Sequence, residues 1–172
     1  MISIRQHRMH SPIAATIMAV LILLPVAAAH AFEQGRSSVS VMVSPGRQLD
    51  QNYVVLAGRY GRYFVPDFEA SITVEAWRGN DPAIYKLMPE LRYVYSRGAP
   101  VKPYVGIFVS RTFYQGLSDR NTYGGKLGAY ATINPSAYLG MGVTYERIER
   151  CDTSVYRNCG QIYPEIGMHF LF

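Results

Sequence analysis

Apolar and polar side chains alternate along this chain in segments of about ten residues. The clearest segment is 68–77, which has apolar residues at its even positions and chiefly polar residues at its odd positions. Successive side chains of a strand point to opposite faces, so such a segment has one apolar and one polar face. Seven further segments show the same alternation, four of them more weakly: 37–44, 53–63, 85–96, 102–111, 123–133, 136–146 and a last one that ends at Phe172.

The connections between these segments also alternate, in their length. Short turns are predicted at 64–67, 97–101 and 133–136, and longer polar links at 45–52, 79–84, 112–122 and 147–161. Short turns on one side and long loops on the other are typical of outer-membrane barrels, whose long loops lie outside the cell. The predicted fold class is therefore all-β: an eight-stranded antiparallel up-and-down transmembrane β-barrel with both termini in the periplasm.

Two prolines conflict with this pattern. Pro89 and Pro164 fall inside predicted strands, where proline removes a hydrogen bond of the ladder. We expect them at bulges or near a rim of the barrel.

Composition supports a membrane barrel. Of the 172 residues, 49% are hydrophobic and only 17% are charged, which excludes a disordered chain and an ordinary charged globular surface. Fifteen glycines and fourteen tyrosines suit short strands, tight turns and an aromatic rim. Beyond the N-terminal segment no apolar run is long enough to cross a membrane as a helix. A closed barrel also leaves no backbone group unpaired in lipid.

The N-terminus has the features of a secretory signal. Early arginines precede an apolar run at 13–29, and a small-x-small cleavage site follows at 29–31. The alternative, a single transmembrane anchor, is disfavoured because the run is short and Pro25 interrupts it. We therefore expect a signal peptide at 1–31, a mature barrel domain at 32–172, and localisation in the bacterial outer membrane. The remaining positive charge is too small to indicate nucleic acid.

Two stretches carry a family resemblance: the C-terminal Gly167-Met168-His169-Phe170-Leu171-Phe172 and the internal Pro103-Tyr104-Val105-Gly106. With them the chain resembles the small eight-stranded outer-membrane barrels of the OmpA transmembrane-domain and OmpX type, which are often called porin-like. The resemblance implies an assembly signal at Gly167, Phe170 and Phe172. It also implies the barrel-assembly machinery and periplasmic chaperones as partners during biogenesis. We further expect a monomer. Leu171, where the family often has a polar residue, is a departure.

The inward faces of the predicted strands collect five acids, four permanent bases and one histidine. An eight-stranded barrel has an interior barely wide enough for its own side chains, and an isolated buried charge is very costly. We therefore predict a structural plug of paired charges; the alternative is a path for protons or small ions. The predicted lumen residues are Arg59, Glu69, Glu75, Lys86, Glu90, Arg92, Lys126, Glu146, Glu165 and His169.

Cys151 and Cys159 are the only cysteines. Both lie in the exported part of the chain, so we expect them to form a disulfide in an oxidising compartment. The alternatives are two free thiols or a metal pair, but no histidine lies nearby to complete a zinc site. We predict no metal and no cofactor.

Arginines gather in the predicted external loops and at strand ends. Arginine binds phosphate bidentately, and the lipopolysaccharide of the outer leaflet is rich in phosphate. The predicted partners are outer-membrane lipids and lipopolysaccharide; the alternative is a solvated face with local partners such as Asp119. The candidate contacts are Arg78, Arg111, Arg120, Arg147, Arg150 and Arg157.

A lipid A deacylase or acyltransferase is the enzymatic alternative. That chemistry requires a histidine base, usually beside a serine nucleophile. The predicted mature chain has one histidine, His169, and no His-x-Ser pair. We therefore predict no catalytic residues.

Aromatic residues near strand ends are expected to form interfacial girdles rather than an aromatic ligand site: Tyr63, Phe68, Tyr85, Tyr95, Tyr123 and Tyr145.

The resulting hypothesis is an integral outer-membrane barrel with a structural or surface-interaction role and a plugged lumen. The first alternative is an adhesin or serum-resistance protein that acts through its external loops. A narrow channel and a lipid A-modifying enzyme are further alternatives.

Overall fold

The computed structural model describes residues 32–48, 51–97, 100–149, 151 and 159–172. The predicted signal peptide, 1–31, lies outside the described residues. Eight strands make up the fold: Ser37–Gln48 (β1), Gln51–Val65 (β2), Phe68–Arg78 (β3), Ile84–Val94 (β4), Val101–Tyr114 (β5), Arg120–Asn134 (β6), Ala137–Ile148 (β7) and Gly160–Leu171 (β8). Among the described residues, no helix is long and apolar enough to cross a membrane.

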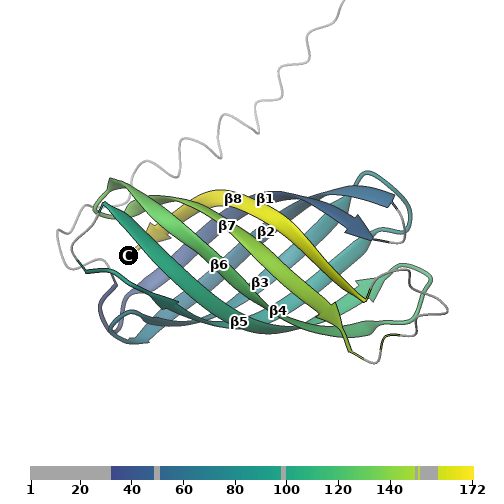
Figure 1. Ribbon diagram of the computed structural model, residues 1–172, viewed down its shortest axis with the longest axis horizontal. Helices are drawn as coiled ribbons and strands as arrows, with labels where there is room; N and C mark the ends of the chain where they lie inside the picture. The colour runs from purple at the N-terminus through teal and green to yellow at the C-terminus, as the bar shows by residue number, and fades with distance from the viewer. Residues whose placement is uncertain (1–31, 49–50, 98–99, 150, 152–158) are drawn as a thin grey trace, which may run out of the picture.

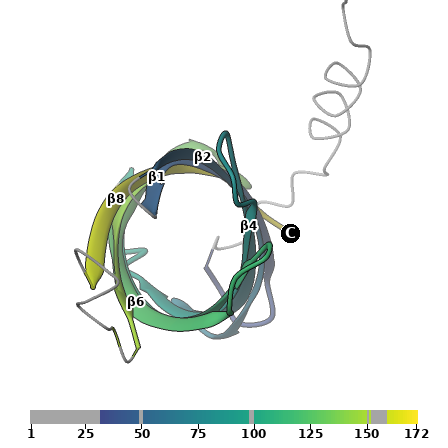
Figure 2. The same ribbon diagram turned by 90° about the vertical axis from the view of Figure 1, so that its right-hand side faces the viewer.

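The strands form one closed antiparallel barrel. Each strand pairs with the next along the chain, and β8 pairs with β1 to complete the ring. Figure 1 shows the tilted strands from the side, and Figure 2 shows the ring nearly end-on. Phe32 and Phe172 lie at one end, called the terminus end below; the β1–β2, β3–β4, β5–β6 and β7–β8 connections lie at the other, the loop end. The predicted fold class is confirmed.

The connections at the loop end differ from the prediction. The expected long link at 45–52 is wrong, because β1 continues to Gln48 and β2 resumes at Gln51, with Arg47 paired to Asn52. Polar side chains do not prevent backbone pairing where the strands extend beyond an apolar band. The longest connection is the last one, 149–159. At the terminus end, the strand expected at 85–96 stops at Val94.

Alternation divides every strand between two environments. In β3, Ile72 and Val74 are exposed on the outer face, whereas Glu69, Thr73 and Glu75 are buried in the lumen. The outer face is apolar around the ring and the inner face is mixed. Strand tilt and closure therefore place every second residue in a narrow interior.

Two apolar clusters lie inside the barrel, one toward each end. The terminus-end cluster consists of Phe32, Tyr63, Val94, Tyr104, Tyr130, Tyr138 and Leu171. The loop-end cluster consists of Tyr53, Val55, Trp77, Ile84 and Tyr114. Phe32, where the sequence predicts the mature chain to begin, packs its ring 5.6 Å from Tyr63 and 5.2 Å from Tyr138.

Exposed aromatic rings occur near the strand ends, as expected for girdles. Phe68 packs on Tyr93 at the terminus end, with ring centroids 4.8 Å apart, and Tyr85, Tyr123 and Tyr145 are exposed toward the loop end. The assignment of Tyr63 to a girdle is wrong. Its side chain shares the inward face of β2 with Arg59 and is 0% exposed.

Candidate functional site

All ten predicted lumen residues are buried. They occupy inward positions on six of the eight strands, β2, β3, β4, β6, β7 and β8, which the ring brings together although the chain separates them. The inward direction of each follows from alternation alone, whereas the partner of each depends on strand order and register.

Glu90 is the centre of this charged layer. Its carboxylate lies 2.5 Å from Arg92 Nη2, 3.6 Å from Lys126 Nζ and 3.8 Å from Arg59 Nη1. Arg92 Nε also donates a hydrogen bond to Glu90 Oε1 at 2.7 Å. Three cations from three strands therefore meet at one buried carboxylate, which offsets much of the cost of burying them.

A second ion pair joins opposite sides of the barrel. Lys86 Nζ lies 2.6 Å from Glu146 Oε2, and Thr122 donates to the same carboxylate at 2.7 Å. The Lys86 ammonium also lies 4.5 Å from the centre of the Trp77 ring, within the range of a cation–π interaction. This pair connects the charged layer to the loop-end cluster.

The remaining acids are held less uniformly. Lys126 reaches Glu165 at 3.0 Å, and Arg59 reaches Glu69 at 3.7 Å, where Ser38 also donates a hydrogen bond. Glu75 accepts a hydrogen bond from the indole of Trp77 at 2.9 Å. Among the described residues, Glu75 alone of the five acids has no ion pair within 4.0 Å.

Sequence reasoning missed a Ser–His contact in the lumen. Ser40 Oγ lies 2.7 Å from His169 Nδ1, because β1 and β8 place these two residues directly opposite each other. Arg59 Nη2 lies 2.9 Å from the same nitrogen, and the ring stacks on Tyr130 with centroids 4.6 Å apart. No sequence motif could reveal a pair separated by 129 positions. Both side chains are buried, so a lipid carbonyl has no access to Ser40.

A small cavity lies beside this pair. It has a volume of about 10 Å³, which is room for roughly one water molecule. Its lining includes Arg59, Arg92, Tyr130 and His169. Within the described part of the chain, no group of three or more His, Cys, Asp or Glu side chains is arranged to hold a metal ion.

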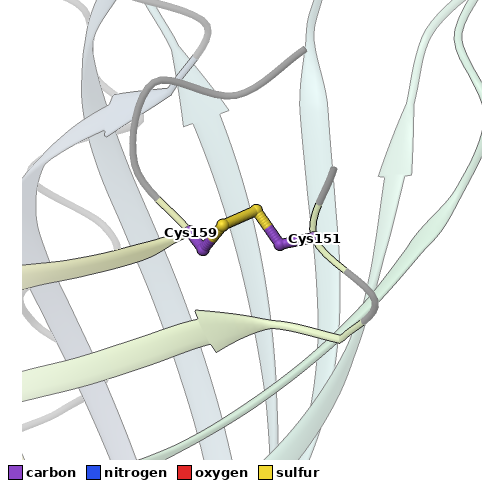
Figure 3. The surroundings of a disulfide bond; sticks show 2 residues. All are labelled: Cys151 and Cys159. Atoms are coloured by element: carbon purple, nitrogen blue, oxygen red, sulfur yellow. A yellow bond between two sulfur atoms is a disulfide. The ribbon is translucent and has the colours of Figure 1, made fainter. Parts of the chain in front are cut away.

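The two cysteines form a disulfide. Cys151 and Cys159, separated by eight positions, are bonded to each other, and Figure 3 shows the bond joining the segment after β7 to the start of β8. Ile148 N–H donates to the Cys159 carbonyl at 2.9 Å. The disulfide therefore closes the last loop where the two strands leave the barrel.

Four of the six candidate arginines are among the described residues, and these four lie at or near the loop end. Arg78, Arg111 and Arg147 are exposed and Arg120 is half-buried; Arg150 and Arg157 lie outside the described residues. Arg111 forms an ion pair with Asp119 at 3.1 Å, and Arg78 donates to the Tyr85 hydroxyl at 2.8 Å. Arg111 thus has a local acidic partner, as expected if these arginines form a solvated face instead of binding phosphate.

The candidate assembly-signal residues complete β8. Phe172 is exposed and Phe170 is half-buried at the outer face, whereas Leu171 is buried in the terminus-end cluster. A Cβ atom at Gly167 would overlap the Val41 carbonyl and the Met42 side chain. Gly167 therefore has a packing reason to be glycine, independent of any role in recognition.

Known structures share this fold at low sequence identity. The N-terminal β-barrel domain of OprF from Pseudomonas aeruginosa superposes with a TM-score of 0.62 at 12% identity, over 81% of this chain and 98% of that one. Neisserial surface protein A superposes with a TM-score of 0.59 at 15% identity, over 80% and 96%. The Pseudomonas aeruginosa outer-membrane protein OprG gives 0.53 at 15%, over 84% and 99%. No known family model and no curated protein sequence matches the chain.

Proposed function

We propose that this protein is an integral outer-membrane barrel with a structural or surface-interaction role and a lumen closed to ions. The observation that carries this proposal is the charged layer: cations and carboxylates lie paired across an interior that has an apolar cluster toward each end. The apolar outer face requires a hydrocarbon environment, since such an extended exposed apolar surface would otherwise cause association.

The same geometry argues against a wide channel and against an enzyme. Continuous conduction needs connected water, whereas the lumen around Glu90 holds direct ion pairs. Acyl transfer needs an accessible nucleophile, whereas Ser40 is enclosed. The experiment is to purify the refolded protein and record currents in a planar bilayer. We expect no stable conductance of porin size; reproducible large currents that change in Glu90→Gln would refute the closed lumen.

Location is tested separately. Cell fractionation with a heat-modifiability gel should place the folded protein in the outer-membrane fraction, and mass spectrometry should give a mature N-terminus at Phe32.

Deleting Phe172 should lower the folded fraction if β8 carries the signal read by the assembly machinery, whereas replacing Phe172 with Tyr should preserve it. Unchanged folding after the deletion would contradict that role.

An adhesin or serum-resistance role is the second candidate. The last connection, 149–159, is the longest, and a disulfide joins Cys151 to Cys159. Lipopolysaccharide phosphates are the proposed partners of Arg78 and Arg147, which are exposed toward the loop end of the barrel. Replacing both arginines with Gln should weaken binding to phosphorylated lipid A, and deleting 152–158 should abolish adhesion without unfolding the barrel.

A further inference from the structure

The β1–β8 seam is paired along only part of its length. Its ladder runs from Ser38 opposite Leu171 to Val43 opposite Ile166. Both strands continue toward the loop end, β1 to Gln48 on β2 and β8 from Gly160 on β7. Within these described segments, none of residues 44–48 pairs with β8. Figure 2, which faces the loop end, shows the ends of β1 and β8 apart.

Two opposed prolines account for this end of the ladder. Ser37 and Phe172 exchange both backbone hydrogen bonds, at 2.9 and 3.0 Å. In an antiparallel ladder such hydrogen-bonded pairs recur at every second residue. Counting by twos along both strands leads to the pair Pro45 and Pro164. This pair should also exchange two hydrogen bonds, but neither residue has an N–H group to donate.

A single proline elsewhere in the barrel has a smaller effect. Tyr95 N–H donates to the Pro103 carbonyl at 2.8 Å, and counting from that pair makes Pro89 and Val109 a hydrogen-bonded pair. The β4–β5 ladder is interrupted after Leu87 but resumes at Glu90. Val109 keeps its own N–H, so one bond remains possible. Of these two ladders, only the β1–β8 ladder, in which both opposed residues are prolines, does not resume.

The opposed prolines leave two carbonyl acceptors without their regular donors. Both prolines are exposed on the outer face, between the exposed Val43 on β1 and Ile162, which is 72% exposed, on β8. Ile162 lies opposite Tyr145, a ring of the loop-end girdle. The carbonyls therefore lie where the apolar band meets the interface. Unpaired backbone groups in hydrocarbon cost several kcal/mol.

We propose that this open seam binds a lipid of the lipid A type, whose amide N–H and hydroxyl groups donate to the carbonyls of Pro45 and Pro164. Such a lipid carries these donors at the roots of its acyl chains, at the depth where the seam opens. Its chains would lie against the apolar surface formed by Val43 and Ile162. The inference rests on the proposed outer-membrane location, but it requires no phosphate and none of the candidate arginines at the loop end.

The test uses dephosphorylated lipid A and the full mature protein refolded in detergent, with binding measured by native mass spectrometry. The double variant Pro45→Val/Pro164→Val supplies the two missing donors and allows the seam to close, so it should fold at least as well. We expect its affinity to fall by about tenfold or more, as the loss of one or two hydrogen bonds implies. Pro89→Val, a lipid-facing proline away from the seam, is the matched control and should bind normally.

Hydrogen exchange at residues 45, 47, 162 and 164 provides the second measurement. In the double variant these amides should become protected, and lipid binding should be lost with that protection. Equal binding by the double variant would overturn the proposal, and so would a seam that stays open without the prolines. If the wild-type protein binds phosphorylated but not dephosphorylated lipid A, binding by the loop-end arginines is supported and binding by the seam is refuted. Absence from the outer-membrane fraction would contradict the proposed function alone.

Discussion

The inward and outward faces of each strand differ in how specific their side chains must be. In the lumen, Glu90 lies among three cations, Arg92 on its own strand and Arg59 and Lys126 on two other strands. Each of these buried charges is stabilised by its oppositely charged partners. On the outer face, Leu127 and Ile107 are mostly exposed to the surroundings of the barrel. An inward residue therefore needs a particular partner, whereas an outward residue needs only to be apolar. Substitutions should accordingly be costly inside and mild outside.

The largest effect is expected at the centre of the lumen. Glu90→Gln removes the carboxylate shared by Arg92, Lys126 and Arg59, and leaves cations buried without it. Breaking such a buried arrangement costs about 3–5 kcal/mol. Urea unfolding in vesicles at neutral pH measures the loss. A cost below that of Leu127→Val, a substitution on the outer face, would remove the distinction between the two faces.

The next effect lies outside both faces, in the last loop. Replacing Cys151 and Cys159 with Ser frees the loop that the disulfide closes, which should cost about 2.5 kcal/mol at most because the loop is short. Alkylation without reductant should label neither cysteine in the native protein. Equal stability of the oxidised protein and the double variant would show that the disulfide contributes nothing to folding.

Within the lumen, Glu75→Gln tests whether an acid without an ion pair contributes less to stability than Glu90 does. Glu75 accepts from Trp77 Nε1, and the amide oxygen of Gln can accept the same bond. With no ion pair to lose among the described residues, the cost should be about 1 kcal/mol. The same urea experiment measures it beside Glu90→Gln. A cost equal to that of Glu90→Gln would show that burial of charge, rather than direct pairing, sets the energetics of the lumen.

The smallest effect is expected on the outer face. Leu127→Val removes one methylene from a side chain that is exposed on the barrel surface, so the change should be about 0.8 kcal/mol. Unfolding free energy and the heat-modifiable fraction should both remain close to those of the wild type. A loss of several kcal/mol would point to a specific contact at this face, such as a partner in the membrane.

The sequence by itself determined the eight strands and the face on which each residue lies. Alternation is a property of the chain, because a strand turns successive side chains to opposite sides whatever its neighbours are. All ten predicted lumen residues are accordingly buried. The prediction failed at Tyr63, which was placed in a girdle although the alternation of its strand puts it on the inward face. It also failed at 45–52, where polar residues were interpreted as a loop but the strands continue.

Only the tertiary structure decided which residues meet. The contacts of Lys86 with Glu146 and of Ser40 with His169 depend on the order, register and closure of the strands. The same holds for Pro45 and Pro164: the observed register of β1 and β8, continued by two residues beyond Val43 and Ile166, would set them opposite each other. The face to which a side chain points depends only on its own strand. The residue that it contacts across the barrel depends on how the first and last strands join to close the ring.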